Sequence, residues 1–218
     1  MKVLLSLAVV SALAGWRAPV TQDDANVIVG RAAKVYRSLT SLRADFKQVI
    51  DDEAVGTFES HGVMVQSGQN KLTMRFSDPK GDAIILDGQY VWVYTPSTTP
   101  GQVLRMPIPT GPVYGFNVLA WLLDKPAERY RARYLKRDFV DFAQTDVVEL
   151  VPLASDLPFK KATLWLDRDT ALPRKVVVEE RAGGTRTLTL SKLKTNGPVT
   201  DKTFEFDVPN GVRVIEQS

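Results

Sequence analysis

The stretch from Gly81 to Pro96, GDAIILDGQYVWVYTP, constrains the fold more than any other part of the sequence. Two apolar runs, Ala83–Leu86 and Tyr90–Tyr94, flank an Asp-Gly pair, and this arrangement predicts a β-hairpin. In the second run three aromatic residues alternate with two valines, so both faces of the strand are apolar. An antiparallel hairpin usually keeps one face in water, so both faces of this one must be covered. We interpret one cover as a helix layer and the other as partly a bound apolar ligand. Burial without a ligand is the simpler interpretation of this stretch taken alone.

The rest of the chain predicts one helix followed by a large sheet. Apolar residues recur at helical spacing from Ile28 to Leu42, which predicts an amphipathic helix over Asp23–Leu42 that begins at a capping pair, Thr21 and Asp24. Segments of strand length then follow, separated by turn residues: Arg43–Ile50, Gly56–Gln66, Lys71–Phe76, Gln102–Met106, Arg129–Lys136, Asp146–Val151, Lys161–Asp167, Lys175–Glu180, Thr185–Leu193 and Thr203–Val208. The short apolar run Gly115–Leu123 indicates a buried helix or plug, with a strand as the alternative.

This order of elements predicts an α+β fold that is mostly β. A single antiparallel sheet of roughly ten strands should curl strongly rather than stay flat. Two helices fill its concave face only in part, which leaves a cavity between the sheet and the helices.

The first residues have the pattern of a signal peptide. The apolar run Val3–Ala14 follows Lys2, and at about a dozen residues it is too short to span a bilayer. Its last residues, Ala-Leu-Ala, predict cleavage after Ala14. The chain has no cysteine, so we expect neither a lipid anchor nor disulfides, and a soluble form in the periplasm. We therefore expect a signal peptide over 1–14, a flexible lead-in over 15–22 and one domain over 23–218.

Signatures of catalysis, metal binding and nucleic-acid binding are absent from the sequence. His61 is the only histidine, and there is no Gly-x-Ser-x-Gly elbow, phosphate loop or dinucleotide fingerprint. A net charge of +3 is too small to indicate a nucleic-acid partner. We expect no enzyme, no catalytic residues, no metal and no cofactor. An enzyme built from carboxylates that are distant in sequence is the alternative that a single sequence leaves open.

Several segments in order resemble one known family. They are Leu42–Gln48 (LRADFKQ), Gly62–Val65, Pro79 with Ile84–Gly88 and Val91–Pro96, and Phe204–Val214 (FEFDVPNGVRV). Together they resemble the bacterial outer-membrane lipoprotein carrier family, LolA. The resemblance implies an incomplete β-barrel whose concave face is covered by helices, around an apolar cavity for lipoprotein acyl chains. It also implies three partners: acylated lipoproteins, an inner-membrane ABC lipoprotein-releasing transporter and an outer-membrane receptor.

The chain departs from this family just after Gly62–Val65. The family often carries Arg-Pro there, and its arginine is tied to lid closure and ligand release. Gly68 and Gln69 stand at the equivalent positions, which puts the usual release mechanism in doubt and leaves room for a different cargo. A lipid-binding transporter or an envelope sensor module on the same half-barrel is the alternative function. We expect a monomer in either case.

A carrier of acyl chains needs a large apolar cavity, because each methylene exposed to water costs about 0.8 kcal/mol. We expect a movable lid made by the first helix and Gly115–Leu123. The aromatic face of Tyr90–Tyr94 is the first choice for the lining, although the sequence leaves open which face of this strand is concave. Ordinary core packing is the alternative for any single residue. The candidate lining residues are Leu72, Met74, Phe76, Trp92, Tyr94, Leu104, Met106, Phe116, Leu119 and Leu122.

Overall fold

The computed structural model describes residues 22–217 except 55, 69, 109–114 and 156, and its main feature is one open, curled sheet. The sheet has twelve strands in the order β12-β6-β5-β4-β3-β2-β1-β11-β10-β9-β8-β7. The strands are β1 (Leu42–Asp52), β2 (Gly56–Ser67), β3 (Lys71–Asp78), β4 (Ala83–Asp87), β5 (Tyr90–Tyr94), β6 (Gln102–Pro107), β7 (Tyr130–Val140), β8 (Ala143–Pro152), β9 (Phe159–Asp167), β10 (Pro173–Glu180), β11 (Thr185–Thr195) and β12 (Arg213–Glu216). This confirms the mostly-β fold with a single curled sheet. Neighbouring strands are antiparallel, as expected, except that β12 runs parallel to β6.

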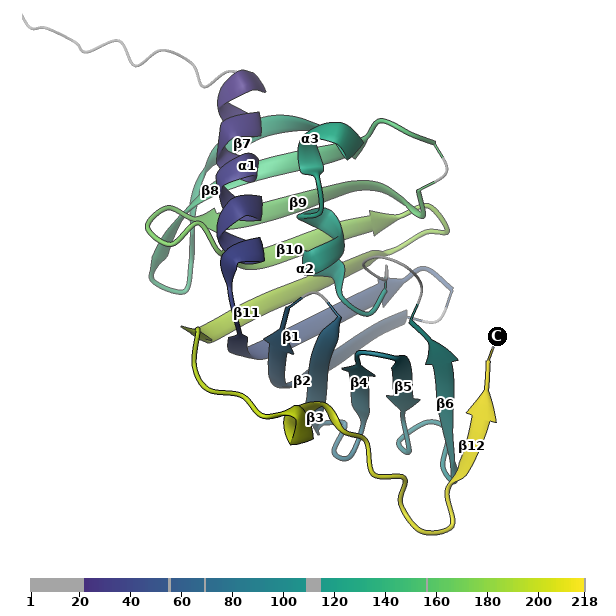
Figure 1. Cartoon of the computed structure of the whole chain (residues 1–218). Coiled ribbons are helices and arrows are strands. Elements are labelled where there is room, and N and C mark those ends of the chain that lie inside the picture. The colour runs from purple at the N-terminus through teal and green to yellow at the C-terminus, as the bar shows by residue number, and fades with distance from the viewer. Residues whose placement is uncertain (1–21, 55, 69, 109–114, 156, 218) are drawn as a thin grey trace, which may run out of the picture.

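Three α-helices lie on one side of the sheet: α1 (Gln22–Ser38), α2 (Val118–Leu122) and α3 (Pro126–Arg129). Figure 1 shows α1 in front of the strands from β7 to β10, with α2 beside it and α3 above α2. The backbone of α1 contacts β7, β8 and β9. A curled sheet has a concave and a convex face, and these helices cover the concave one. Within the described residues, no helix has the length and apolar character needed to cross a membrane.

The register of the strands assigns each side chain to a face, because directly opposed residues in a sheet share one face. One row of opposed residues belongs to the concave face and runs Met64, Met74, Ile84, Val93 and Leu104. The next row belongs to the convex face and runs Val65, Thr73, Ile85, Trp92 and Arg105. The two rows decide which predicted residues can reach the space beneath the helices.

The hairpin of β4 and β5 confirms the prediction from the Asp-Gly pair. Gly88 has a φ of 105°, a conformation that favours glycine. Asp87 Oδ1 accepts hydrogen bonds from the backbone N–H groups of Gln89 and Tyr90, both at 2.7 Å. Its Oδ2 accepts a third bond from Trp92 Nε1, also at 2.7 Å. One carboxylate therefore holds the turn and orients the indole that follows it.

The first helix ends earlier than its apolar spacing predicts. It stops at Ser38, whose hydroxyl donates to the carbonyl of Val35 at 2.8 Å, and Leu42 already begins β1. Serine and threonine compete for backbone hydrogen bonds, and the run from Ser38 to Ser41 ends the helix in this way. The predicted capping pair involves Thr21, which lies outside the described residues.

The segment after β11 corrects another prediction. Thr203–Val208 was expected to be a strand, but a short 3₁₀ helix, η1 (Asp201–Phe204), is followed by extended chain that pairs with no strand. The apolar alternation in this segment is real, yet it serves packing on the convex face, where Phe204 is 2% exposed. The last strand, β12, was not predicted from the sequence. It follows Gly211, which has a φ of 83°.

Candidate functional site

An apolar cluster occupies the space between the concave face and the helices, so the cavity expected there is filled by the protein's own side chains. Tyr36 from α1 and Leu119 and Leu122 from α2 are buried in it, and they meet strand residues such as Leu86 and Val91. All five residues of α2 are buried, although this helix has little more than one turn. Because an isolated helix of this length is unstable in water, its side-chain contacts hold α2 in place. The helix therefore acts as a plug in the concave face.

Eight of the ten predicted lining residues lie on the concave side. Leu72, Met74, Leu119 and Leu122 are buried within the cluster. Phe76, Met106 and Phe116 are partly buried and pack against it. Leu104 opposes Val93 and so shares its face. These eight residues come from three places in the chain. Three lie on β3, two lie on β6, and three lie in α2 or just before it.

Trp92 and Tyr94 lie on the opposite, convex face, so the expectation that they line the cavity is corrected. Their ring centroids are 5.4 Å and 5.5 Å from that of Phe206, in the segment that follows η1. The two valines of β5 face the cluster instead. Both faces of β5 are apolar because both are covered by this chain itself. The recurrence of Phe204 and Phe206 was the sequence signal for this second cover.

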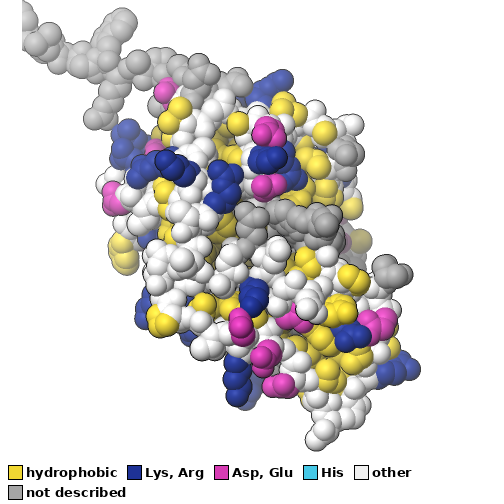
Figure 2. Space-filling model, in the orientation of Figure 1, with side chains coloured by type: hydrophobic (Ala, Val, Ile, Leu, Met, Phe, Trp, Pro, Cys, Tyr) yellow, Lys and Arg dark blue, Asp and Glu magenta, His cyan; other side chains and the backbone are white. Residues whose placement is uncertain are grey.

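This convex region is visible on the surface. Figure 2 shows hydrophobic side chains gathered over the part of the sheet formed by β5 and β6, with charged side chains among them. The guanidinium carbon of Arg105 lies 4.7 Å from the ring centroid of Tyr90 and 5.2 Å from that of Trp92. Arg105 also pairs with Glu216 of β12. These contacts fasten the end of the chain to the sheet and leave the concave face to the helices.

Trp121 anchors the plug. Its ring centroid lies 5.3 Å from that of Phe159 and 6.2 Å from that of Tyr130. The guanidinium carbon of Arg129 lies 4.0 Å from the centroid of the Trp121 ring, and its Nη1 donates to the Trp121 carbonyl at 2.9 Å. Asn117 caps the helix by accepting from the N–H of Ala120 at 3.1 Å. Burial raises the pKa of the Tyr130 hydroxyl well above its usual range.

One arginine on the concave face touches the plug segment, and sequence reasoning missed it. Arg186 opposes Val178 in the sheet, and its Nη1 donates to the carbonyl of Gly115 at 3.0 Å. Its Nε lies 3.8 Å from Glu180 Oε1. This places a charged pair beside the start of the plug. The available sequence signal was that Arg186 stands two residues before Leu188, at a position where the alternation of the strand 185–195 would place an apolar residue.

Tyr36 fixes the end of α1 to the sheet. Its hydroxyl donates to Gln66 Oε1, and Gln66 Nε2 donates to the carbonyl of Gly68 at 2.8 Å. Burial raises the pKa of the Tyr36 hydroxyl well above its usual range, and the bond to Gln66 opposes this rise. At the position where the family often has an arginine, Gly68 therefore takes part in a neutral hydrogen-bond chain. Gln69 lies outside the described residues.

The chemistry of the site is that of apolar contact. In the part of the chain that the structure describes, no three His, Cys, Asp or Glu side chains are grouped in a way that would hold a metal ion. The concave side chains are aliphatic, aromatic or Met, and such side chains adapt to flexible apolar ligands.

Comparisons with known proteins agree with this arrangement. The family model described as outer membrane lipoprotein carrier protein LolA matches residues 37–207. A protein named outer-membrane lipoprotein carrier protein from Methylobacillus flagellatus is 26% identical over 183 residues, which cover 83% of this chain and 84% of that protein. One with the same name from Chromohalobacter salexigens is 26% identical over 191 residues, 86% of each chain.

Solved structures share the fold. An uncharacterized conserved protein from Thermus thermophilus superposes with a TM-score of 0.57 at 13% identity, over 88% of this chain and 99% of that one. The lipoprotein LppX from Mycobacterium tuberculosis gives a TM-score of 0.50 at 14% identity, over 83% and 99%. At these identities the likeness concerns the fold alone. With the family model matched over most of its length, this chain belongs to the LolA family of outer-membrane lipoprotein carrier proteins.

Proposed function

We propose that this protein is a periplasmic carrier that holds lipoprotein acyl chains between its sheet and its helices and delivers them from the inner to the outer membrane. Membership of a lipoprotein carrier family supports the general role. The observation that carries the specific proposal is the plug, a short helix whose buried residues occupy the concave face of an open sheet. The residues beneath and within the plug are the proposed acyl-chain contacts.

The energetics of exchange support this proposal. Fully burying one large apolar side chain is worth roughly 1.5–3 kcal/mol, so the four large side chains of α2 gain roughly 6–12 kcal/mol. Burying one acyl chain of about 15 methylenes gains about 12 kcal/mol. The two gains are similar, so an acyl chain can displace the plug from the same surface without a large net change. The same balance allows the cargo to leave when the next site binds it more tightly.

The proposed partners follow from this role. Acylated lipoproteins are the cargo, an inner-membrane ABC lipoprotein-releasing transporter supplies them, and an outer-membrane receptor takes them where one is present. The protein performs no covalent chemistry in this scheme and needs no cofactor. Its work is to keep acyl chains out of water between two membranes.

Locking the plug tests the proposal. The chain has no cysteine, so Trp121→Cys/Phe159→Cys introduces the only two thiols, at positions whose rings are in contact. We expect the double variant to take up a fluorescent triacylated lipopeptide before the thiols are bridged by a short bis-maleimide, and to lose uptake after bridging. Equal uptake by the bridged protein would show that the plug does not have to move.

A second bridged variant shows whether a loss of uptake comes from locking the plug or from the cross-linking reagent itself. Lys47→Cys/Glu59→Cys links two exposed side chains that form an ion pair on β1 and β2, away from the plug. Bridging these two strands should leave lipopeptide uptake unchanged. If both bridged proteins lose uptake, the loss comes from the modification and not from the locked plug.

A lipid transporter or envelope sensor on the same fold is the second candidate. The observation that favours it is the neutral hydrogen-bond chain at Gln66 and Gly68, where the family often has an arginine tied to release. Mass spectrometry of protein purified from the periplasm distinguishes the two. Bound acylated proteins support the carrier, and bound free phospholipid or glycolipid supports the alternative.

A further inference from the structure

Two hollows adjoin each other on the convex face, on the side of the sheet opposite the plug. One has a volume of about 450 Å³ and the other about 240 Å³. Both are lined by Arg43, Val65 and Thr203, so they adjoin along these residues, and the two together are here called the groove. Its roof is the segment of residues 194–206, here called the strap. Figure 1 shows the strap leaving β11 and running past β1, β2 and β3.

The strap is fastened on both sides of the groove. At its start, the N–H of Asn196 donates to the carbonyl of Ser41 at 2.9 Å, and Ser41 Oγ donates to the carbonyl of Gly197 at 2.7 Å. At its far side, Thr73 Oγ1 donates to the carbonyl of Thr203 at 2.8 Å, next to the buried ring of Phe204. The chain between these points arches over the sheet. The groove is therefore held open by the fold.

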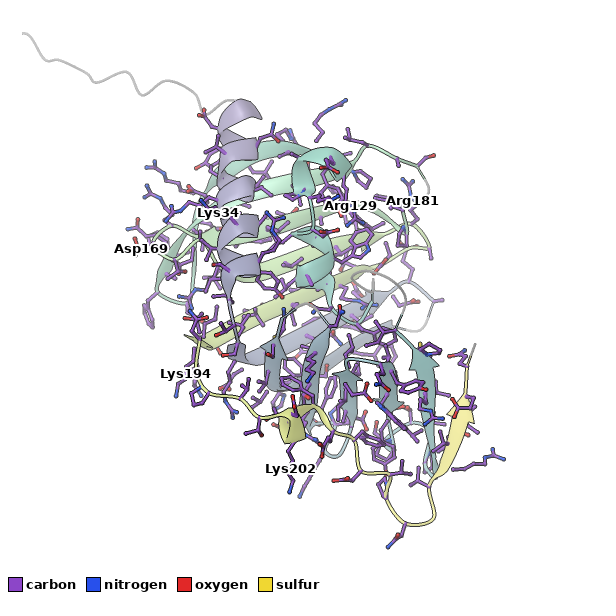
Figure 3. The ribbon with its side chains drawn as sticks, viewed as in Figure 1. Lys34, Arg129, Asp169, Arg181, Lys194 and Lys202 are labelled. Carbon is purple, nitrogen blue, oxygen red and sulfur yellow. The ribbon has the colours of Figure 1, made fainter. Side chains whose placement is uncertain are left out.

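The groove is strongly basic. Four cationic side chains line it, and none of its lining residues is acidic: the cations are Arg43, Arg75, Lys194 and Lys202. Figure 3 shows Lys194 where the strap begins and Lys202 on η1. Among the described residues, none of these four side chains forms an ion pair. Arg75 Nη2 reaches only the carbonyl of Glu205, at 3.5 Å.

Two carboxylates close in sequence to lining residues, those of Asp45 and Asp201, are paired with cations outside the groove. Asp45 Oδ2 lies 2.8 Å from Lys192 Nζ. Asp201 Oδ1 lies 2.6 Å from Lys71 Nζ, and this ion pair lowers the pKa of Asp201. Since no lining residue is acidic, the positive charge within the groove has no counterion among the residues that line it. Like charges held this close repel one another, and an anion in the groove would relieve the repulsion.

The floor of the groove is apolar. Arg43 on β1 opposes Val65 on β2, and Arg75 on β3 opposes Val63 on β2. The two arginines therefore lie on one face with two valines between them. Neighbouring strands are about 4.8 Å apart, so the guanidinium groups extend from strands about 10 Å apart, on either side of this apolar strip.

We propose that this groove binds a phosphate ester that carries an apolar group. Arg43 and Arg75 donate to the phosphate oxygens, since guanidinium groups suit the paired oxygens of such an anion. Val63 and Val65 contact the apolar part, and the two lysines of the strap add charge. The phosphate can belong to a lipid headgroup or to a free phosphate ester. This site lies on the other face from the plug and does not depend on the proposed carrier function.

Titration of the ¹⁵N-labelled full chain tests the proposal. The probes are dihexanoyl phosphatidylglycerol below its aggregation limit, dihexanoyl phosphatidylcholine and glycerol 3-phosphate. We expect phosphatidylglycerol to shift the backbone amide signals of Val65, Thr73 and Thr203 more strongly than phosphatidylcholine, whose positive choline the groove repels. Glycerol 3-phosphate binding as tightly as phosphatidylglycerol would identify a free phosphate ester as the ligand. Weaker binding of glycerol 3-phosphate would identify a lipid headgroup.

Variants decide whether the groove is responsible. Arg43→Gln/Arg75→Gln should weaken binding about tenfold or more, the loss expected when charge-assisted hydrogen bonds are removed. Lys194→Gln/Lys202→Gln should weaken it less. Arg131→Gln/Lys160→Gln removes the same net charge from exposed positions outside the groove and should leave binding unchanged. The proposal is wrong if no probe shifts these amides, or if all three double variants bind alike.

Discussion

Arg186 on β11 donates from Nη1 to the backbone carbonyl of Gly115, 3.0 Å away, and so ties the concave face of the sheet to the segment that leads into the plug. The other contacts of the plug are mainly apolar, apart from the bond that Arg129 of α3 makes to Trp121. Apolar contacts can be replaced by those of an acyl chain, whereas a hydrogen bond from a charged group cannot. Arg186 therefore favours the closed arrangement when no cargo is present.

Replacing Arg186 by methionine should make the plug open more often. Arg186→Met keeps an extended side chain but loses the bond to Gly115, which is worth roughly 1.5–3 kcal/mol for a charged donor. We expect hydrogen exchange at the amides of Trp121 and Leu123 to accelerate about tenfold or more, with faster uptake of lipopeptide. Arg133→Met is the matched control, since it loses hydrogen bonds to Glu149 and leaves the plug intact. Equal exchange in the two variants would contradict a tether.

Substitutions on the two faces of the sheet should have opposite effects on cargo binding and stability, even where the substituted residues lie on neighbouring strands. Met106 packs against the concave cluster, and Met106→Gln places an amide there with little change of size. We expect lipopeptide binding to weaken about tenfold, because burying an amide without a partner costs about 1–3 kcal/mol. Trp92→Gln should leave binding intact and lower the free energy of unfolding, since Trp92 packs against Phe206 and donates to Asp87. Measurements of lipopeptide affinity and chemical unfolding on both variants check this. The reverse pattern would place the cargo on the convex face.

These two residues also show how far the sequence predicts the site. Periodicity identifies the strands and the plug, because a side-chain alternation of two and a short apolar run are local properties. It does not say which side of β5 is concave, because both sides are covered and both are apolar. The cover on the aromatic side comes from Phe206, more than a hundred residues later in the chain. The contact of Arg186 with Gly115 is also distant in sequence, and only the folded sheet brings the two together.

Acid should destabilise the protein through Asp138. Hydrogen bonds from Lys136, Trp165 Nε1 and the N–H of Phe139 lower the pKa of this carboxyl from its ordinary value of 3.8 to about 2. Because the folded-state pKa is the lower one, the stabilisation is complete above pH 3.8 and is lost as the pH falls towards 2. Asp138→Asn should flatten the fall of Tm with pH in this window. Asp141→Asn, in the same hairpin, is the control. If the two variants follow the same pH curve, these three donors do not set the acid response.

The bond between Tyr36 and Gln66 predicts a non-additive pair of substitutions. Tyr36→Phe removes the buried hydroxyl that donates to Gln66 Oε1 and should cost about 1–3 kcal/mol, because the amide oxygen loses this donor in a buried place. Gln66→Met should cost a similar amount, because it leaves the buried hydroxyl of Tyr36 without its acceptor. The double variant should lose less free energy of unfolding than the sum of the two single losses. With both polar partners replaced by apolar groups, no buried donor or acceptor is left unsatisfied. Chemical unfolding of the four proteins measures this coupling. Simple additivity would mean that this bond contributes nothing specific to the position of α1, which Arg31 also ties to the carbonyls of Arg168 and Asp169.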